Sequence, residues 1–373
     1  MTTTSRKSIV SAALTTTLAL ALAFTTPPPE ALADSGCSRS GAYETCFTDP
    51  PPGGEDRTIV HRLRELVSST KRGDKIRVSM YLWNQTGIAR DLVEAKDRGV
   101  NVQVVVDDAA EPERPYKILQ AGGVPVRVCV DGCLGDKINH TKFFLLEIGP
   151  DRYVAQTSSN LTDSMLKRTN DLVIVKNNAS IYEFYLGYWN RMRGGSWTHA
   201  GDTWSNSDRT ATGSRVKAYA FPRTDFDVYL AILRNVTECR DGDKKIWVTA
   251  SLFTGPREEV RNRLAYMEDV MGCNVKVLVR KQDHELWAQV NTSGGYNLNN
   301  SKVRRVPNLH NKILIIDAKY NGRWQETVIT GSHNLTSPSL LRNEEAMLRI
   351  EDSFVFKRYR SYFDDLYDGS VSS

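Results

Sequence analysis

Two short stretches of this 373-residue chain share one pattern: His140-Thr-Lys-Phe-Phe-Leu-Leu-Glu147 and His310-Asn-Lys-Ile-Leu-Ile-Ile-Asp317. Each has a histidine, a variable residue and a lysine, then four apolar residues and a carboxylate. A short apolar run of this kind is typical of a buried strand. Side chains at positions i and i+2 of a strand share a face. Each histidine and its lysine therefore point the same way, on what we interpret as two copies of one structural unit.

The same order of elements precedes each stretch, which extends the repeat to most of the chain. A buried strand is followed by a segment with helical spacing of apolar residues and then by a second strand, a pattern that predicts parallel pairing. The predicted segments are 75–83, 88–96 and 101–107 in the first copy, and 245–253, 258–271 and 274–280 in the second. We therefore predict an α/β fold of two similar βαβ-rich halves, packed as one pseudo-twofold unit with mixed sheets flanked by helices.

The domain boundaries follow from changes in composition. The stretch 194–214 is rich in Gly, Ser, Thr, Asn and Asp, which is typical of a loop or linker. We expect a signal peptide over 1–33, an irregular lead-in over 34–54, a first half over 55–193, the linker over 194–214 and a second half over 215–373.

Further polar residues recur after each apolar stretch. Ser158 and Asn160 correspond to Ser332 and Asn334, 174 residues later. An acid follows each asparagine by eleven residues, and an arginine lies three residues before each acid. The acids are Asp171 and Glu345, and the arginines are Arg168 and Arg342. Buried cores exclude unpaired lysine and histidine, so core packing does not explain this repetition.

These residue types suit the chemistry of a phosphate group. Lysine ammonium groups, asparagine amides and serine hydroxyls donate hydrogen bonds and together can bind a tetrahedral oxyanion. One of two facing imidazoles can attack phosphorus while the other exchanges a proton with the leaving and entering oxygens. An acid beside each histidine would fix its tautomer and raise its basicity.

The paired motifs resemble those of the phospholipase D superfamily, whose hallmark is a duplicated His-x-Lys-x4-Asp. The resemblance covers residues 55 to 370. It implies hydrolysis or transfer of a phosphodiester through a phosphohistidine, without a metal ion or other cofactor. It also implies a site at the interface of the halves, with His140 as the nucleophile. The implied phosphate pocket comprises His140, Lys142, Ser158, Asn160, His310, Lys312, Ser332 and Asn334, and Asp171 and Glu345 match the histidine-orienting acids.

One position departs from the pattern of this superfamily. The first motif ends in Glu147, where the superfamily has an aspartate, while the second ends in the usual Asp317. The acid at this position has a supporting role in the superfamily. We therefore expect both acids to contribute to the site, with Glu147 as its atypical member.

The N-terminus and the cysteines both indicate export. Arg6 and Lys7 precede an apolar run, and Ala31-Leu-Ala33 is a small-x-small cleavage pattern, as in a secretory signal. Six cysteines follow it, an even number that suggests disulfides in an exported chain. No C-x-x-C pair with nearby histidines supports a zinc site. Proximity along the chain favours the pairs Cys37–Cys46 and Cys129–Cys133, which leaves Cys239–Cys273.

The host and the partners are expectations of the same kind. Asn160 and Asn334 both lie in N-x-Thr sequons, where a glycan would block the site, so we expect secretion by a bacterium. We expect a monomer without an obligate protein partner, acting at a membrane or micelle surface. The candidate residues for a lipid-facing rim are Trp83, Trp197, Trp204, Trp287 and Tyr296.

Composition and charge restrict the substrate without deciding it. The chain is 40% hydrophobic and 25% charged with a formal net charge of +5, which excludes a disordered chain and argues against a DNA-coating protein. We predict a phospholipase D that acts on glycerophospholipids, with transfer to small alcohols as a side reaction. A metal-independent endonuclease is the main alternative, although a nuclease should have a longer basic track than the clusters 257–263 and 302–305. A non-catalytic protein that binds anionic lipids is the third.

Overall fold

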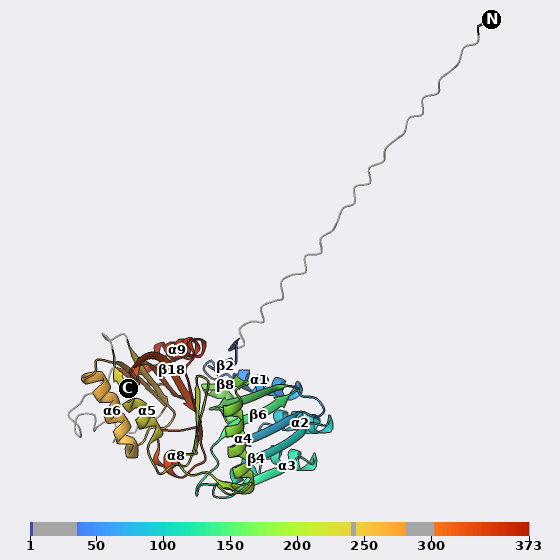
Figure 1. Ribbon diagram of the computed structural model, residues 1–373, viewed down its shortest axis with the longest axis horizontal. Coiled ribbons are helices and arrows are strands. Elements are labelled where there is room, and N and C mark those ends of the chain that lie inside the picture. The colour runs from blue at the N-terminus through green and yellow to red at the C-terminus, as the bar shows by residue number, and fades with distance from the viewer. Residues whose placement is uncertain (3–35, 240–243, 281–301, 373) are drawn as a thin grey trace. The chain divides into compact units, whose positions relative to one another are not determined.

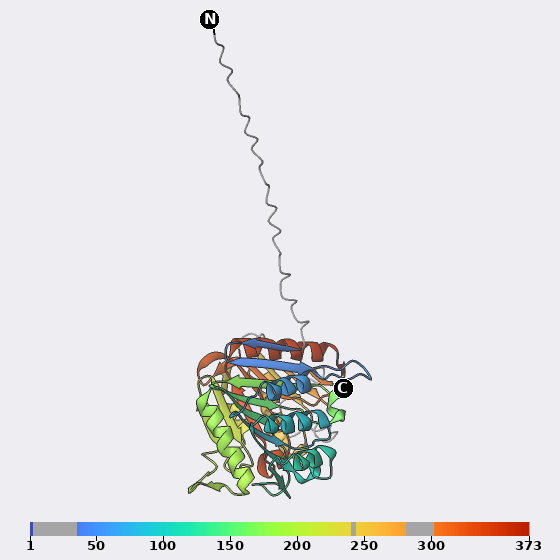
Figure 2. The same ribbon diagram turned by 90° about the vertical axis from the view of Figure 1, so that its right-hand side faces the viewer.

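The computed structural model describes residues 1–2, 36–239, 244–280 and 302–372 of the chain. Residues Ser35–Ser373 form one compact unit. The unit contains two mixed sheets flanked by helices, as Figures 1 and 2 show. No helix among the described residues combines the length and the apolar character needed to cross a bilayer. Residues 3–33 of the expected signal peptide, and Trp287 and Tyr296, lie outside the described residues.

The first sheet has the strand order β1-β2-β8-β7-β6-β3-β4-β5. Its strands β3, β4 and β5 are parallel, and the other pairs are antiparallel. Helices α1 (Thr58–Ser68), α2 (Thr86–Asp97) and α3 (Arg114–Ala121) pack on the outer face through apolar residues at helical spacing. The strands are β1 (Cys37–Ser40), β2 (Tyr43–Thr48), β3 (Lys75–Met80), β4 (Asn101–Asp107), β5 (Val126–Cys129), β6 (Lys142–Ile148), β7 (Asp151–Thr157) and β8 (Asn170–Lys176).

The second sheet repeats this order strand for strand as β11-β12-β19-β18-β17-β14-β15-β16, with β20 added at the edge and β13 beside β17. Helices α5 (Val228–Arg234) and α6 (Glu258–Asp269) cover its outer face. The strands are β11 (Thr210–Gly213), β12 (Val216–Ala220), β13 (Val236–Glu238), β14 (Lys245–Ala250), β15 (Asn274–Val279), β16 (Val303–Arg305), β17 (Lys312–Tyr320), β18 (Arg323–Gly331), β19 (Ala346–Ile350) and β20 (Val371–Ser372). The identical order confirms the predicted repeat and the α/β fold of two similar halves.

The inner faces of both sheets share one core with two long helices, α4 (Ala179–Gly194) and α9 (Ser353–Asp368). The helices make equivalent contacts: Tyr185 of α4 packs edge-on against Phe143, and Phe363 of α9 stacks on Trp247. Each helix ends one half and also touches the other sheet, α4 at β11 and β12 and α9 at β2. This exchange holds the two halves together.

The expected lead-in and linker differ from the structure. Strands β1 and β2 form a hairpin that is the counterpart of β11 and β12, so the first half begins near Cys37 and the second near Thr210. Between them lies a small hairpin of β9 (Thr198–His199) and β10 (Asp202–Thr203). The stretch Tyr43–Thr48 is buried throughout although half of it is polar, which is why apolar periodicity misses it.

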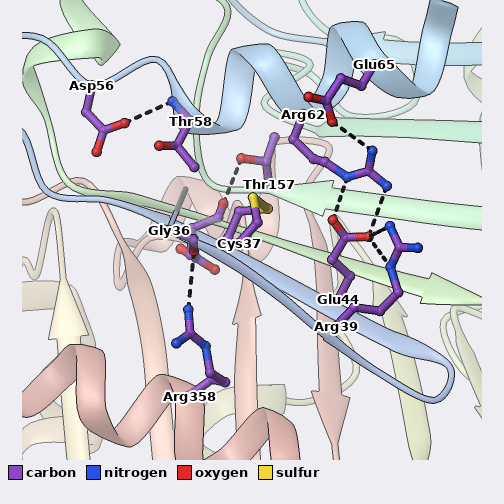
Figure 3. Close-up of a disulfide and its surroundings, with 12 residues drawn as sticks. Gly36, Cys37, Arg39, Glu44, Asp56, Thr58, Arg62, Glu65, Thr157 and Arg358 are labelled. Atoms are coloured by element: carbon purple, nitrogen blue, oxygen red, sulfur yellow. Dashed lines mark hydrogen bonds and ion pairs between the residues drawn. A yellow bond between two sulfur atoms is a disulfide. The ribbon is translucent and has the colours of Figure 1, made fainter. Parts of the chain in front are cut away.

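Covalent and ionic contacts stabilise this N-terminal hairpin, as Figure 3 shows. Cys37 and Cys46 face each other across the hairpin and form a disulfide. Glu44 is paired with both Arg39 and Arg62, and the Arg358 guanidinium donates a hydrogen bond to the carbonyl of Gly36 at 3.3 Å. These contacts attach the hairpin to α1 and α9.

The structure confirms the predicted disulfide pairs, but the tryptophans of the expected rim that it describes pack against the cores. The disulfides Cys37–Cys46, Cys129–Cys133 and Cys239–Cys273 confirm the pairing favoured by proximity. Trp83 is buried in the core behind the first sheet and donates its indole N–H to the carbonyl of Gln85, so it forms no rim. Trp197 and Trp204 pack against the central core, each beneath an arginine, because α4 supplies an apolar surface there.

Candidate active site

Both histidine–lysine pairs lie at equivalent ends of two central strands. Lys142 and Lys312 begin β6 and β17, and each ammonium donates a hydrogen bond to the carbonyl of the histidine two residues earlier, His140 or His310. All four side chains are buried, and Lys142 has no exposed surface. Buried lysines need anionic or hydrogen-bonding partners, so this arrangement has the character of an anion-binding site.

The backbone of each histidine is bound by the opposite half of the protein. The His140 N–H donates to the carbonyl of Glu344 at 2.9 Å, and the His310 N–H donates to the carbonyl of Thr169 at 3.1 Å. These contacts bring residues about 200 and 140 positions apart in the chain together with one geometry, which fixes the two motifs relative to each other.

His140 is oriented by a carboxylate. Its Nδ1 atom lies 2.9 and 2.8 Å from the two carboxylate oxygens of Glu345. The Ser332 hydroxyl also donates to this carboxylate, and the Asn343 amide donates to it at 3.4 Å. The geometry favours a tautomer in which Nδ1 carries the proton and Nε2 has a free lone pair.

His310 is oriented by an amide, which corrects the role expected for Asp171. Its Nδ1 atom lies 2.9 Å from the side-chain oxygen of Asn170. Asp171 instead accepts hydrogen bonds from the Asn311 amide at 2.9 Å, the Tyr359 hydroxyl at 2.9 Å and the Thr330 hydroxyl. Asp171 therefore supports the strands that frame the site without touching a histidine.

The reason is a shift of one residue between the halves. Ser158 N–H bonds to the carbonyl of Asp171, whereas Ser332 N–H bonds to that of Ala346. Asp171 is therefore the counterpart of Ala346, and Asn170 is the counterpart of Glu345. In the first half, the connection from Ser158 to Asp171 contains a 3-10 turn (Asp163–Lys167). In the second half, the connection from Ser332 to Ala346 contains the short helix α8 (Ser337–Leu341) and is one residue longer.

Burial and mutual repulsion lower the pKa values of the basic groups of the site. Burial lowers the pKa of His140 to about 4, although Glu345 opposes the shift, and it lowers the pKa of Lys142 to about 7. Burial and then the charge of Lys142 hold the pKa of Lys312 well below its ordinary value, and burial and Lys312 do the same for His310. Burial alone would raise the pKa of Glu345, but His140 lowers it overall. A bound anion would relieve this repulsion.

The asparagines and serines of the second motif also belong to this region. Asn160 and Asn334 are both buried, and neither side-chain oxygen has a hydrogen-bond partner within the described residues. The hydroxyl of Ser158 accepts the backbone N–H of Asp171 at 3.0 Å, and the hydroxyl of Ser332 accepts that of Ala346 at 3.1 Å. The serines thus bind the backbone of β8 and β19 directly after Asn170 and Glu345.

Glu147 and Asp317 lie outside the site, contrary to expectation. Each is five residues beyond its lysine, about 16 Å along an extended strand. Glu147 pairs with Lys75 at 2.9 Å, and Asp317 pairs with Lys244 at 2.9 Å. They hold the far end of the central strand to its neighbours, so the extra methylene of Glu147 does not reach the histidines.

Sequence reasoning missed two residues at the site. Asn170 was overlooked because its neighbour Asp171 is an acid at the repeated spacing. An alignment of β8 with β19, in place of an alignment of the motifs before these strands, would have found Asn170. Tyr81 follows β3, with its ring centroid 5.0 Å from that of His140 and 5.3 Å from the Lys142 ammonium. Its counterpart after β14 is Ser251, so the tyrosine distinguishes the two halves.

The donor atoms of the site suit an anion better than a metal ion. Within the described residues, one group of metal-type donors lies close together, namely Cys37, Glu44 and Cys46, and its two sulfurs form a disulfide. The histidines of the site are surrounded by lysines, which would repel a cation.

Comparison with known proteins assigns the family. A family model described as "Cardiolipin synthase, PLD-like domain" matches residues 63–193 and 232–367, one match in each half. The chain belongs to the phospholipase D superfamily. Phosphodiesterase activity is what this membership supports.

The individual proteins that this chain resembles are only distantly similar to it in sequence. A protein named phospholipase D from Rickettsia prowazekii is 28% identical over 155 residues, which are 42% of this chain and 69% of that protein. Phosphatidylserine synthase from Haemophilus influenzae has a similar fold, with a TM-score of 0.59 and 12% identity over 88% of this chain and 87% of that one. Polyphosphate kinase from Porphyromonas gingivalis has a TM-score of 0.58 and 16% identity, and the match covers 87% of this chain and half of the kinase. The identities to the solved structures show a shared fold and leave the substrate open.

Proposed function

We propose that this protein is an exported phospholipase D, which cleaves glycerophospholipids into phosphatidic acid and a free headgroup. The observation that carries the proposal is the convergence of two buried histidine–lysine pairs, with each histidine oriented by a residue of the opposite half. The name of the Rickettsia relative favours a phospholipid substrate. Three disulfides favour an oxidising compartment, as expected for export.

The proposed reaction begins when Lys142 and Lys312 bind the non-bridging oxygens of the phosphodiester. Nε2 of His140 attacks phosphorus, and the bond from phosphorus to the headgroup oxygen breaks. His310, as imidazolium, donates a proton to that oxygen, so the headgroup leaves as an alcohol and not as an alkoxide. The phosphatidyl group remains bonded to His140.

The second half of the reaction regenerates the free enzyme. His310 takes a proton from water as the water oxygen attacks phosphorus, and the bond from phosphorus to His140 breaks. Phosphatidic acid leaves. A small alcohol in place of water would give a new phosphodiester, which is the transfer reaction expected from the sequence.

The unequal partners of the two histidines favour these roles. A carboxylate beside Nδ1 stabilises the positive charge that His140 acquires when its Nε2 bonds to phosphorus. A neutral amide oxygen beside Nδ1 stabilises an imidazolium less, so His310 gives up its proton more readily. The carboxylate partner therefore suits His140 as the nucleophile, and the amide partner suits His310 as the general acid.

The basic clusters considered for a nuclease are occupied in other ways. Arg257 is buried and paired with Asp227 at 2.8 Å, and Arg263 donates to carbonyls of the chain. Lys302 is paired with Glu268 at 2.7 Å, and Arg304 lies over the ring of Tyr367. Arg257 and Lys302, whose charges are neutralised by carboxylates, contribute little to a track for a nucleic-acid backbone. This favours a lipid over a nucleic acid.

The test offers the exported chain phosphatidylcholine vesicles in excess EDTA and measures choline and phosphatidic acid, with plasmid DNA in a parallel reaction. We expect choline release that His140→Ala and His310→Ala both abolish. DNA cleavage with no lipid turnover would replace the proposal with a nuclease. Binding of vesicles without turnover of either substrate would indicate the non-catalytic alternative.

A substrate with an activated leaving group then separates the two histidines. Phosphatidyl-p-nitrophenol needs no acid for its first step. We expect His310→Ala to release one equivalent of nitrophenol and to retain a phosphatidyl group detectable by mass spectrometry, whereas His140→Ala releases none. The opposite pattern would assign the nucleophile to His310.

A further inference from the structure

Two arginines from opposite halves lie beside the His310 end of the site. Arg168 precedes Thr169 and Asn170, and its carbonyl accepts hydrogen bonds from the Thr48 hydroxyl at 2.9 Å and the Asn170 amide at 3.0 Å. Arg280 follows β15, and its N–H bonds to the carbonyl of Ala250, the residue that pairs with Lys312 in the sheet. Arg168 thus lies two residues before Asn170, the hydrogen-bond partner of His310. Arg280 is hydrogen-bonded to β14, the strand beside Lys312.

Among the residues that the structure describes, no carboxylate neutralises either arginine. Both side chains are half-buried, and in the described part of the chain no carboxylate lies within ion-pairing distance of either guanidinium. Burial, and after it the charge of Arg168, lowers the pKa of Arg280. The charge of Arg168 also acts on His310, and that of Arg280 acts on Lys312, so the two arginines and the catalytic pair lie in one region of positive potential.

The other end of the site has the opposite character. By strand register, the counterpart of Arg280 is Asp107, whose carboxylate accepts the backbone N–H of Asn139 at 2.7 Å and that of Ala109 at 3.1 Å. Because of the one-residue shift between the halves, the structural counterpart of Arg168 is the neutral Asn343. Arg342, which the 174-residue offset of the sequence aligns with Arg168, is paired with Asp136 at 2.8 Å. The pseudo-twofold symmetry is therefore broken in charge, and among these positions the cations without a carboxylate partner lie at the His310 end.

Half-buried guanidinium groups without a partner lose hydration and gain nothing in return unless a ligand supplies the charge. Their planar donors match phosphate or carboxylate oxygens. In the proposed reaction the headgroup leaves at His310, where these donors lie. The group that they meet is therefore part of the leaving headgroup.

We propose that Arg168 and Arg280 form a second anion subsite that binds a phosphate carried by the leaving headgroup of a phospholipid substrate. This proposal rests on the proposed phospholipase D activity. It predicts that the enzyme prefers a headgroup with an additional phosphate to the same headgroup without that phosphate.

The test compares dibutanoyl phosphatidylinositol with dibutanoyl phosphatidylinositol 4-phosphate, which differ by one phosphate on the leaving group. Short acyl chains keep both lipids monomeric, so adsorption to a charged surface does not enter. We expect a higher kcat/KM for the 4-phosphate in the full exported chain. We expect Arg168→Ala and Arg280→Ala each to reduce the ratio of the two kcat/KM values by about 10-fold or more.

Arg342→Ala is the matched control and should leave the ratio unchanged, because its guanidinium is exposed and paired with Asp136. Arg280→Gln supplies a second variant if truncation to alanine impairs folding. Equal kcat/KM for both lipids in the wild type, or a ratio that neither arginine variant changes, overturns the subsite while phospholipase activity stands. No His310-dependent release from either lipid overturns the proposed function and the subsite together.

Discussion

The Nδ1 atom of His140 lies 2.8 Å from a carboxylate oxygen of Glu345, although the two residues belong to different halves of the chain. The equivalent position beside His310 is occupied by the amide of Asn170 at 2.9 Å. Each histidine is thus completed by the opposite half, and the two are completed differently. Neither half alone has an oriented histidine in this arrangement.

Replacement of Glu345 by glutamine should impair the proposed nucleophile. Glu345→Gln keeps the size of the side chain but removes the charge that stabilises a positively charged His140. We expect kcat to fall by about 100-fold or more. Turnover of phosphatidylcholine and thermal unfolding, measured on the same sample, check this. A variant that folds and keeps the wild-type kcat would show that Glu345 does not act on the reacting histidine.

A carboxylate in place of Asn170 should change the pH dependence. An anionic partner raises the pKa of the His310 imidazolium, so Asn170→Asp keeps the proposed acid protonated to higher pH. We expect the alkaline limb of the kcat profile to move upward by about one pH unit.

Asn170→Ser, which adds no charge, is the control for this change. A profile that moves equally in both variants would point to altered packing instead of altered charge.

Removal of the Glu147 charge should leave the reaction unchanged. Its carboxylate pairs with the half-exposed Lys75 at the far end of β6, and such pairs contribute about 0–1 kcal/mol to stability. We expect Glu147→Gln to keep kcat/KM within about twofold of the wild type and to lower the free energy of unfolding by less than about 1 kcal/mol. A large loss of activity in a stably folded Glu147→Gln protein would contradict the position described for this residue.

Anion binding should be coupled to proton uptake. Burial lowers the pKa of His140 to about 4 and of Lys142 to about 7, both below their ordinary values. For such groups the unfolded chain binds more protons, so their contribution to stability is full above the unfolded pKa and is lost as the pH falls toward the folded one. The windows are therefore 6.5 to about 4 for His140 and 10.5 to about 7 for Lys142.

A bound phosphodiester anion raises both pKa values and removes this loss. We expect dimethyl phosphate, whose single charge is constant over this range, to raise Tm more at about pH 6 than at about pH 9. Lys142→Met should weaken that difference. An increase in Tm that does not depend on pH would indicate that the anion binds elsewhere.

Gly135 allows a loop of the first half to reach the segment that carries Glu345. A Cβ atom at this position would lie 1.8 Å from the carbonyl of Arg342. The backbone N–H groups of Cys133, Leu134 and Gly135 donate to the carboxylate of Glu344, whose carbonyl binds His140.

We expect Gly135→Ala to displace this loop, to lower Tm and to reduce kcat by about 10-fold or more. Gly255→Ala, which meets no atom within 4 Å, should change neither quantity. Wild-type kcat and Tm in Gly135→Ala would show that the loop does not hold Glu344.

Much of the local architecture could be predicted because its physical causes are local. Apolar runs define β6 and β17, helical spacing defines α2, and the i, i+2 rule places each lysine on the side of its histidine. Polar strands are less visible, and the hairpin Cys37–Thr48 was therefore expected to be irregular.

The repeat, the parallel units and the two histidine–lysine motifs follow from the order of residues along the chain, and proximity along the chain favoured the three disulfide pairs. Which side chain contacts which histidine depends on the packing of the two halves. One additional residue before Glu345 shifts the second half relative to the first, so that Asn170 and not Asp171 reaches His310. Spacing along the chain does not reveal such a shift, because strand register is set by packing between segments far apart in sequence. The same holds for Glu147 and Asp317, which a linear motif places beside the lysines but an extended strand carries away from them.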